Sequence, residues 1–390
     1  MTMDGRLLWS RDDTQVRHVA STIKMLNALV VLDHARLGDV VTVSRSALMS
    51  NGGVGLRAGQ KLTVGQLLSI MLIHSANDAA RALAIHVGGT QAGFVAMMNA
   101  KARALGLAHT HAVDPDGFSG RETSTARDLA TLGQLVMAKP VLRQIVGNRF
   151  VSVPRVSGPP VTYASSDLLM GHYAGLEGIK TGFTSGAGFC YVAAARRGPV
   201  ELLGVVLGTP SEAARFGQAR RLLDWGFSHC HSQEVLRPGQ SVTVKVDGRT
   251  IPAEATKPIT VTVFDGAGVV TTRTVALTSA RTGAVREGQP VARLVVYQGG
   301  TVLASAPLVA DRSSATRVGA LSRLGLLPAL VGLAVLAMLT AAGGMMLVRR
   351  PPRGRPRNEI TGRTALTDPS RRTSRRPGPD QPSDRQGRRR

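Results

Sequence analysis

Ser21 and Lys24 stand three residues apart at the start of an apolar stretch with helical periodicity. At this spacing their side chains share one helix face, roughly 5–6 Å apart at Cβ. A serine hydroxyl needs a neighbouring base to act as a nucleophile, and a lysine can serve once burial and a nearby cation lower its pKa. Lysine is rare beside arginine here, and only lysine can be deprotonated. The pair alone is a weak signal, because it also fits a helix cap beside a solvated lysine.

Two further polar side chains, Ser75 and Asn77, fall in a break between two apolar helical stretches. In a catalytic role, Ser75 would relay a proton and Asn77 would hold a substrate amide. The alternative is that Asn77, or its neighbour Asp78, simply caps the helix that follows.

Lys180, Thr181 and Gly182 end or continue a predicted strand. Lys180 supplies a positive charge for a carboxylate, and Gly182 lets a substrate backbone approach closely. Each of the three motifs is common alone. Their occurrence in this order, on a helix, an interhelical loop and a strand, indicates acyl transfer to a serine.

Apolar periodicity predicts the elements that position these residues. We expect helices over 22–37, 63–73, from Asn77 or Asp78 onward, 90–105, 124–139 (capped by Ser124) and 211–225. We expect strands over 5–10, 179–181, 189–193 and 201–207. Together they predict an α/β (α+β) catalytic domain over residues 1–230, with an antiparallel sheet flanked by helices.

The remainder of the chain changes character. Residues 235–310 alternate short Val/Thr strands with turns, which predicts a small β-sandwich domain. A linker over 311–323 precedes residues 324–348, which hold no charge, lie between arginines and are long enough for a transmembrane helix. The basic residues 349–390 are expected to form a disordered cytoplasmic tail, which would leave the catalytic domain outside the cell membrane. Binding of anionic lipid heads is an alternative role for this tail.

The net charge of +23 does not indicate nucleic-acid binding, because much of the excess lies in that tail and membrane topology explains it better. Cys190 and Cys230 have no metal-ligand spacing. They are either two buried thiols or a disulfide of an exported protein. We expect neither a metal nor a cofactor.

From about Met3 to about Val309 the sequence resembles the serine D-alanyl-D-alanine carboxypeptidases, the low-molecular-mass penicillin-binding proteins. The resemblance lies in the segments Ala20–Met25, His74–Ala80, Met98–Ala102, Leu105–Leu107, Asp114–Gly117, Ser124–Leu129 and Gly178–Thr184. It implies a β-lactamase/transpeptidase-like catalytic domain, and a β-rich domain that holds it off the cytoplasmic membrane.

The resemblance also implies roles. Ser21 would attack the carbonyl between the two D-alanines of a peptidoglycan stem peptide, and Lys24 would take its proton. Ser75 would help to pass a proton to the departing D-alanine, after which water would hydrolyse the acyl-enzyme. β-Lactams would acylate Ser21 because they resemble the substrate.

The same resemblance implies the binding residues. Asn77 would bind the acyl side of the substrate, and Lys180 and Thr181 its terminal carboxylate. The backbone N–H groups of Ser21 and Phe183 would form the oxyanion hole.

Two departures from the family pattern stand out. The signal peptide and an extra strand before residues 5–10 are missing, which suggests a misplaced start or a fragment. Ala164-Ser165-Ser166 stands where many relatives carry asparagines, and we expect this to affect loop packing rather than chemistry.

Three alternatives remain. A D,D-endopeptidase acting on cross-links needs the same residues. A β-lactamase would need a deacylating glutamate, and neither Glu122 nor Glu177 sits in a recognisable motif for one. An inactive cell-wall-binding pseudoenzyme would follow if the missing strand abolished activity.

Overall fold

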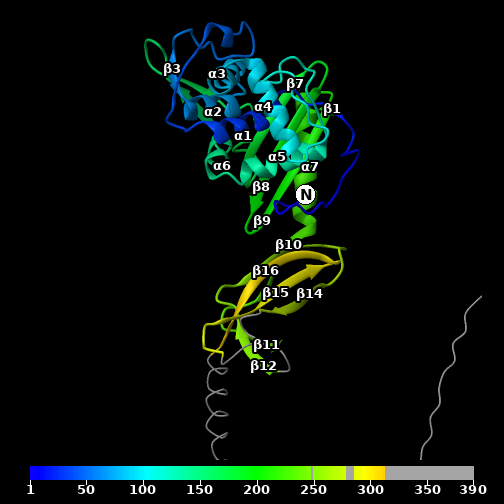
Figure 1. Cartoon of the computed structure of the whole chain (residues 1–390). Helices are drawn as coiled ribbons and strands as arrows, with labels where there is room; N and C mark the ends of the chain where they lie inside the picture. The colour runs from blue at the N-terminus through cyan, green and yellow to red at the C-terminus, as the bar shows by residue number, and fades with distance from the viewer. Residues whose placement is uncertain (247–248, 278–284, 312–390) are drawn as a thin grey trace, which may run out of the picture. The chain divides into compact units, whose positions relative to one another are not determined.

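The computed structural model describes residues 1–246, 249–277 and 285–311 (Figure 1). The predicted transmembrane span 324–348 and the tail 349–390 lie outside these residues, as does all but the first residue of the linker. Among the described residues, no helix has the length and apolarity needed to cross a bilayer.

A three-stranded antiparallel sheet forms the centre of the N-terminal region. Its strands are β7 (Leu176–Thr184), β8 (Gly188–Arg197) and β9 (Val200–Thr209), in that order. Successive side chains of β8 enter different cores, as the two-residue period of a strand requires. Val192 packs in the core that includes α5 (Ala126–Met137), whereas Tyr191 packs in the core that includes α7 (Glu212–His229). The sheet is therefore covered by helices on both faces, with β7 as one edge.

The helical part of this region surrounds one buried helix, α1 (Lys24–His34), which continues directly from the short 3₁₀ helix η1 (Ala20–Ile23). Residues 24–31 of α1 are all buried, because α1 contacts helices on several sides. Those helices are α2 (Val64–Ile73), α3 (Asn77–Gly88), α4 (Gln91–Ala104) and α5; α6 (Pro140–Val146) packs on α2 and α5. This burial takes Lys24 out of water.

Short elements complete the N-terminal region. Three antiparallel pairs join β1 (Arg17–His18) to β4 (Thr123–Ser124), β2 (Val40–Thr42) to β3 (Lys61–Thr63), and β5 (Phe150–Val153) to β6 (Val161–Ala164). A 3₁₀ turn, η2 (Arg45–Ala47), lies between the strands of the second pair. Side-chain oxygens of Thr63, Thr90 and Thr125 cap α2, α4 and α5. The expected cap of α5 at Ser124 is therefore wrong by one residue, because Ser124 pairs in β4 instead.

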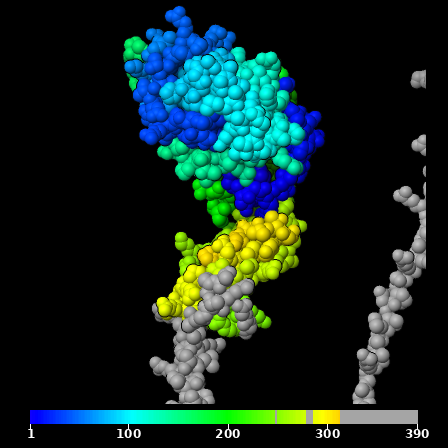
Figure 2. Space-filling view, in the orientation of Figure 1, coloured from blue at the N-terminus to red at the C-terminus, as the bar shows by residue number. Residues whose placement is uncertain are grey.

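The predicted strand over residues 5–10 is also wrong, since these residues form no strand. Residues 1–3 lie along the free edge of β9 instead: Met3 N–H donates to Glu201 O, and Leu203 N–H donates to Met1 O. Unpaired edge groups need partners, and the first three residues supply them. In the space-filling view the N-terminal residues, in dark blue, lie on the surface of this region (Figure 2).

The residues after α7 form two further sheets around a separate core. One sheet pairs β10 (Cys230–Leu236) with β13 (Ile259–Phe264). The other is antiparallel in the order β11 (Ser241–Val246), β12 (Arg249–Glu254), β16 (Thr301–Ala310), β15 (Pro290–Gln298) and β14 (Val270–Ala276). Alternate residues of β13 are buried, so each strand gives one face to a core of Val, Ile, Leu and Ala side chains.

Candidate active site

Lys24 lies at the centre of a hydrogen-bonded cluster drawn from three segments of the chain. Its Nζ donates to Ser21 Oγ at 2.7 Å, to Asn77 Oδ1 at 2.6 Å and to the main-chain oxygen of Asp116 at 2.5 Å. Ser21 Oγ donates in turn to the same oxygen of Asp116 at 3.2 Å. Three acceptors satisfy all three ammonium protons, which a buried lysine requires.

Burial lowers the pKa of Lys24 to about 8, against the carboxyl groups of Asp116, Asp114 and Glu122, which raise it. The lysine side chain is wholly buried. A lysine with this pKa loses its proton near neutral pH, and the neutral amine can then accept the proton of Ser21. The geometry therefore provides a nucleophile with an adjacent base.

Two glycines fix the main chain around Ser21. A Cβ on Gly117, whose φ is +76°, would lie 2.3 Å from the carbonyl oxygen of Ala20, and a Cβ on Gly182 would lie 3.0 Å from the nitrogen of Ser21. Ala20 itself adopts a φ of 48°, which is costly for a residue with a side chain. Gly182, which we predicted as the point of substrate approach, also lies close to the backbone at the start of η1.

The contact at Gly182 brings edge strand β7 next to the Ser21 N–H. Ser21 is the second residue of η1, where no intrahelical acceptor is available for its N–H. Phe183 follows Gly182; its side chain is 53% exposed and its ring stacks on Phe189. This is the neighbourhood that an oxyanion site between the N–H groups of Ser21 and Phe183 requires.

Asn77 is the first residue of α3, and the N-cap is Ala76, which makes no side-chain cap bond. The expected cap at Asn77 or Asp78 is therefore wrong: the Asn77 side chain binds Lys24, and Asp78 Oδ2 accepts from the N–H groups of Val54 and Leu56. Tertiary contacts outweigh the local capping preference at both positions.

Ser75 occupies the turn before α3 with a φ of 69°, a conformation that serine adopts rarely. Its side chain is half-buried, and its hydroxyl makes no hydrogen bond to any described residue. The strained turn holds this hydroxyl free beside Asn77.

Lys180 and Thr181 lie on β7, both buried. Burial lowers the pKa of Lys180 well below its ordinary value, and the nearby cations Lys24 and Arg215 lower it further. Lys180 Nζ donates to Thr181 O at 2.9 Å. A bound carboxylate would supply the negative charge that this lysine lacks.

Ser166 joins two parts of the site. Its hydroxyl is 2.7 Å from Thr181 Oγ1, and its N–H donates to Ile73 O, at the end of α2, at 2.9 Å. We expected the Ala164–Ser166 segment to affect loop packing rather than chemistry, and this stays a prediction. Its last residue, Ser166, contacts a predicted binding residue directly.

Sequence reasoning also missed Arg215, which lies on α7. Its guanidinium donates to Gly182 O at 3.2 Å and lies 4.4 Å and 5.3 Å from the ring centroids of Phe216 and Phe189. Arg215 is only 3% exposed. Nothing near it in the sequence distinguishes it from other arginines, and only the packing of α7 on the sheet brings this second cation to β7.

Other features lie apart from this cluster. A cavity of about 410 Å³ between the N-terminal residues, β9, α5 and α7 contains none of the motif residues. Cys190 and Cys230 are separate, buried thiols.

Comparison with known proteins gives consistent matches. Residues 2–211 match the model of the peptidase family S11, described as D-alanyl-D-alanine carboxypeptidase. D-alanyl-D-alanine carboxypeptidase DacB2 of Mycobacterium tuberculosis is 38% identical over 231 residues, which cover 57% of this chain and 79% of the relative. A D-alanyl-D-alanine endopeptidase of Pseudomonas aeruginosa is 34% identical over 57% of this chain and 73% of its own length.

Among solved structures, penicillin binding protein 5 of Haemophilus influenzae superposes with a TM-score of 0.61 at 26% identity. The match covers 79% of this chain and 93% of that one.

Proposed function

Because this chain belongs to the peptidase S11 family of D-alanyl-D-alanine carboxypeptidases, we propose that it removes the terminal D-alanine from peptidoglycan stem peptides through an acyl-enzyme on Ser21. The observation that carries this proposal is the buried contact of 2.7 Å between Lys24 Nζ and Ser21 Oγ. The Lys24 pKa of about 8 makes the neutral amine accessible near neutral pH.

In the acylation step, neutral Lys24 accepts the Ser21 proton while Oγ bonds to the carbonyl carbon of the penultimate D-alanine. The negative charge that develops on the carbonyl oxygen is held by the N–H groups of Ser21 and Phe183. The carbon–nitrogen bond then breaks, and the proton passes from Lys24, with the help of Ser75, to the departing amine. Water then bonds to the ester carbon and gives a proton to neutral Lys24. The bond from that carbon to Ser21 Oγ breaks, and Lys24 returns the proton to Oγ.

Substrate binding follows from the charges around the cluster. Lys180 and Thr181 bind the terminal carboxylate, and Arg215 on α7 brings a second cation to the same strand through Gly182 O. Asn77 Nδ2 remains available to a substrate carbonyl while its Oδ1 binds Lys24. A β-lactam has the same carboxylate and a reactive carbonyl, so it acylates the same serine.

The decisive experiment is labelling with a fluorescent penicillin, followed by an assay of D-alanine release from a peptide ending in D-Ala-D-Ala. We expect Ser21→Ala to abolish both signals. Lys24→Arg fails nearly as completely, because a guanidinium cannot accept the proton. Ser69→Ala is the matched control, since the Ser69 hydroxyl binds Gly65 O within α2. Folded wild-type protein that neither labels nor releases D-alanine would refute the assignment.

A second activity, cleavage of D,D cross-links, is favoured by the similarity to the Pseudomonas aeruginosa endopeptidase. It uses the same residues and a longer substrate. Incubation with a cross-linked muropeptide dimer separates the two: monomers appear only if cross-links are cut.

We also propose that residues 324–348 anchor the chain in the cytoplasmic membrane, with the catalytic region outside and the basic tail inside. The support is the uncharged sequence bounded by Arg323 and Arg349. Protease added to intact spheroplasts should remove the catalytic region and spare an epitope on the tail. Protection of the catalytic region would contradict this topology.

A further inference from the structure

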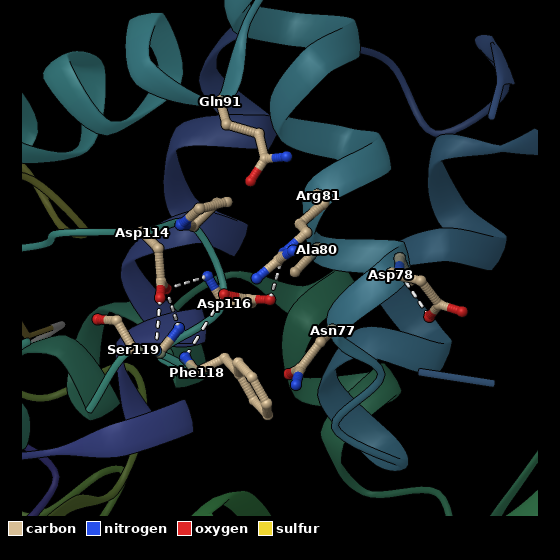
Figure 3. Close-up of polar contacts among 12 residues, drawn as sticks. Asn77, Asp78, Ala80, Arg81, Gln91, Asp114, Asp116, Phe118 and Ser119 are labelled. Carbon is tan, nitrogen blue, oxygen red and sulfur yellow. Dashed lines mark hydrogen bonds and ion pairs between the residues drawn. The ribbon is translucent and has the colours of Figure 1, made fainter. Parts of the chain in front are cut away.

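A turn beside Lys24 is held by an aspartate. The carboxylate of Asp114 accepts hydrogen bonds from the N–H groups of Asp116, Gly117 and Ser119 (Figure 3). Such side-chain-to-backbone bonds fix a tight turn. The turn aims the main-chain oxygen of Asp116 at Lys24 Nζ and Ser21 Oγ.

The side chain of Asp116 points to α3 and pairs with Arg81. Arg81 Nε lies 2.8 Å from Asp116 Oδ2, and the aspartate side chain is 0% exposed. Asn77 lies four residues before Arg81, so both residues share a face of α3. Asn77 binds Lys24 directly, while Arg81 binds the residue whose carbonyl also binds Lys24. One face of α3 therefore supplies one acceptor of the Lys24 ammonium group, through Asn77, and helps to position a second, through Arg81.

The charges of this pair act on Lys24 in opposite directions. The loop over residues 114–122 contributes the carboxyl groups of Asp116, Asp114 and Glu122, which raise the Lys24 pKa, whereas Arg81 on α3 lowers it. On β7, Lys180 faces Lys24 as a second cation.

Asp116 titrates in the same range as catalysis. Burial raises its pKa to about 7, supported by a hydrogen bond with Asp114 and opposed by Lys24 and Arg81. Burial also disfavours ionised Asp114, but the bonds from the Asp116 side chain and the turn N–H groups hold its pKa at about 2. Asp116 therefore changes charge beside Lys24 near neutral pH, and burial also raises the pKa of Glu122 on the same loop.

We propose that Arg81 and Asp116 are positioning residues that set the basicity of Lys24: their contact holds the Asp116 carbonyl on the ammonium group, and once Asp116 is ionised their opposite charges cancel at the base. The proposal rests on the proposed function of Lys24 as the base of acylation. Neither residue contacts the substrate in this role.

The test is the pH dependence of acylation by a fluorescent penicillin. Asp116→Asn keeps the main-chain carbonyl but leaves the Arg81 charge unopposed, so the acid limb of the rate profile should move to lower pH by roughly 1 unit. Adding Arg81→Met removes the second charge, and the limb should return to its wild-type position. A purely structural role would weaken acylation at every pH without this shift and reversal.

Asp33→Asn is the matched control. Asp33 lies on the same helix as Lys24, where it pairs with Lys101 at 2.7 Å with its side chain 36% exposed, so its removal should leave the profile unchanged. If Asp116→Asn does not fold, Arg81→Gln alone carries the test. The acid limb of its rate profile should lie above the wild-type pH.

Three results would overturn the proposal: an unshifted acid limb in Asp116→Asn, a double variant that matches Asp116→Asn, or an Arg81→Gln limb at or below the wild-type pH. Wild-type protein that is not acylated refutes the proposed function instead, so the two failures are distinguishable.

Discussion

Replacement of Gly117 by alanine should slow acylation of Ser21 in a protein that still folds. The added Cβ would lie 2.3 Å from Ala20 O, 2.5 Å from Ala20 C and 2.8 Å from Ser21 N, all main-chain atoms. A real Cβ does not approach within 3.0 Å, so the Gly117 turn and the segment holding Ser21 must move apart by about 0.7 Å. A misplacement of about 1 Å can cost roughly 100-fold in rate. We expect acylation by penicillin to slow by roughly 30- to 100-fold.

The matched control is Gly106→Ala. Gly106 has a φ of +71°, close to the +76° of Gly117, and nothing lies within 4 Å of its added Cβ. Both variants therefore suffer the cost of a left-handed alanine, about 1–2 kcal/mol, which urea unfolding measures. Only Gly117→Ala should lose acylation rate. If Gly117→Ala is acylated within threefold of Gly106→Ala, the argument that Gly117 positions the nucleophile fails.

Two further predictions concern stability and strand support. The pKa of Asp116 is about 7 in the folded state, against 3.8 as its ordinary value. The protonated carboxyl therefore contributes fully to the free energy of unfolding below pH 3.8. This contribution is lost as the pH rises through about 7. Urea unfolding of Asp116→Asn should lack this decline; an unchanged decline would mean that another group causes it. Ser166→Ala removes the hydrogen bond to Thr181 and should slow acylation about tenfold. The control is Ser152→Ala, which removes an exposed hydroxyl contact with Thr162 and should leave the acylation rate unchanged. Equal acylation rates in the two variants would show that Ser166 does not support Thr181.

The elements that carry the predicted site residues could be read from the sequence because apolar spacing survives in each of them. The helix expected over residues 22–37 corresponds to η1 and α1, although α1 ends at His34. The strands expected around Lys180, Val192 and Val205 are the three strands of the sheet. Periodicity reports which side chains are buried.

The details of the site could not be predicted, because they depend on main-chain atoms and distant contacts. The Asp116 oxygen that binds Lys24 is a main-chain group, which residue type does not reveal. Arg215 reaches β7 only because α7 folds back on the sheet. Asn77 is a good cap by residue type, but the nearby ammonium group of Lys24 binds it more strongly than a helix end would.

The strand predicted over residues 5–10 fails for a related reason. Its apolar residues, Leu7, Leu8 and Trp9, resemble a strand by composition, yet pairing along β9 is taken by residues 1–3. A one-dimensional pattern cannot choose between neighbouring segments that compete for one sheet edge.

The three acceptors of Lys24 have a consequence for how the chain folds. They come from residues 21, 77 and 116, so the ammonium group can leave water without a large penalty only after these distant segments have met. Loop closures of this length come late and slow folding. We therefore expect the catalytic centre to be among the last parts of the region to assemble, and acylation by a β-lactam during refolding would mark the chains that have completed this step.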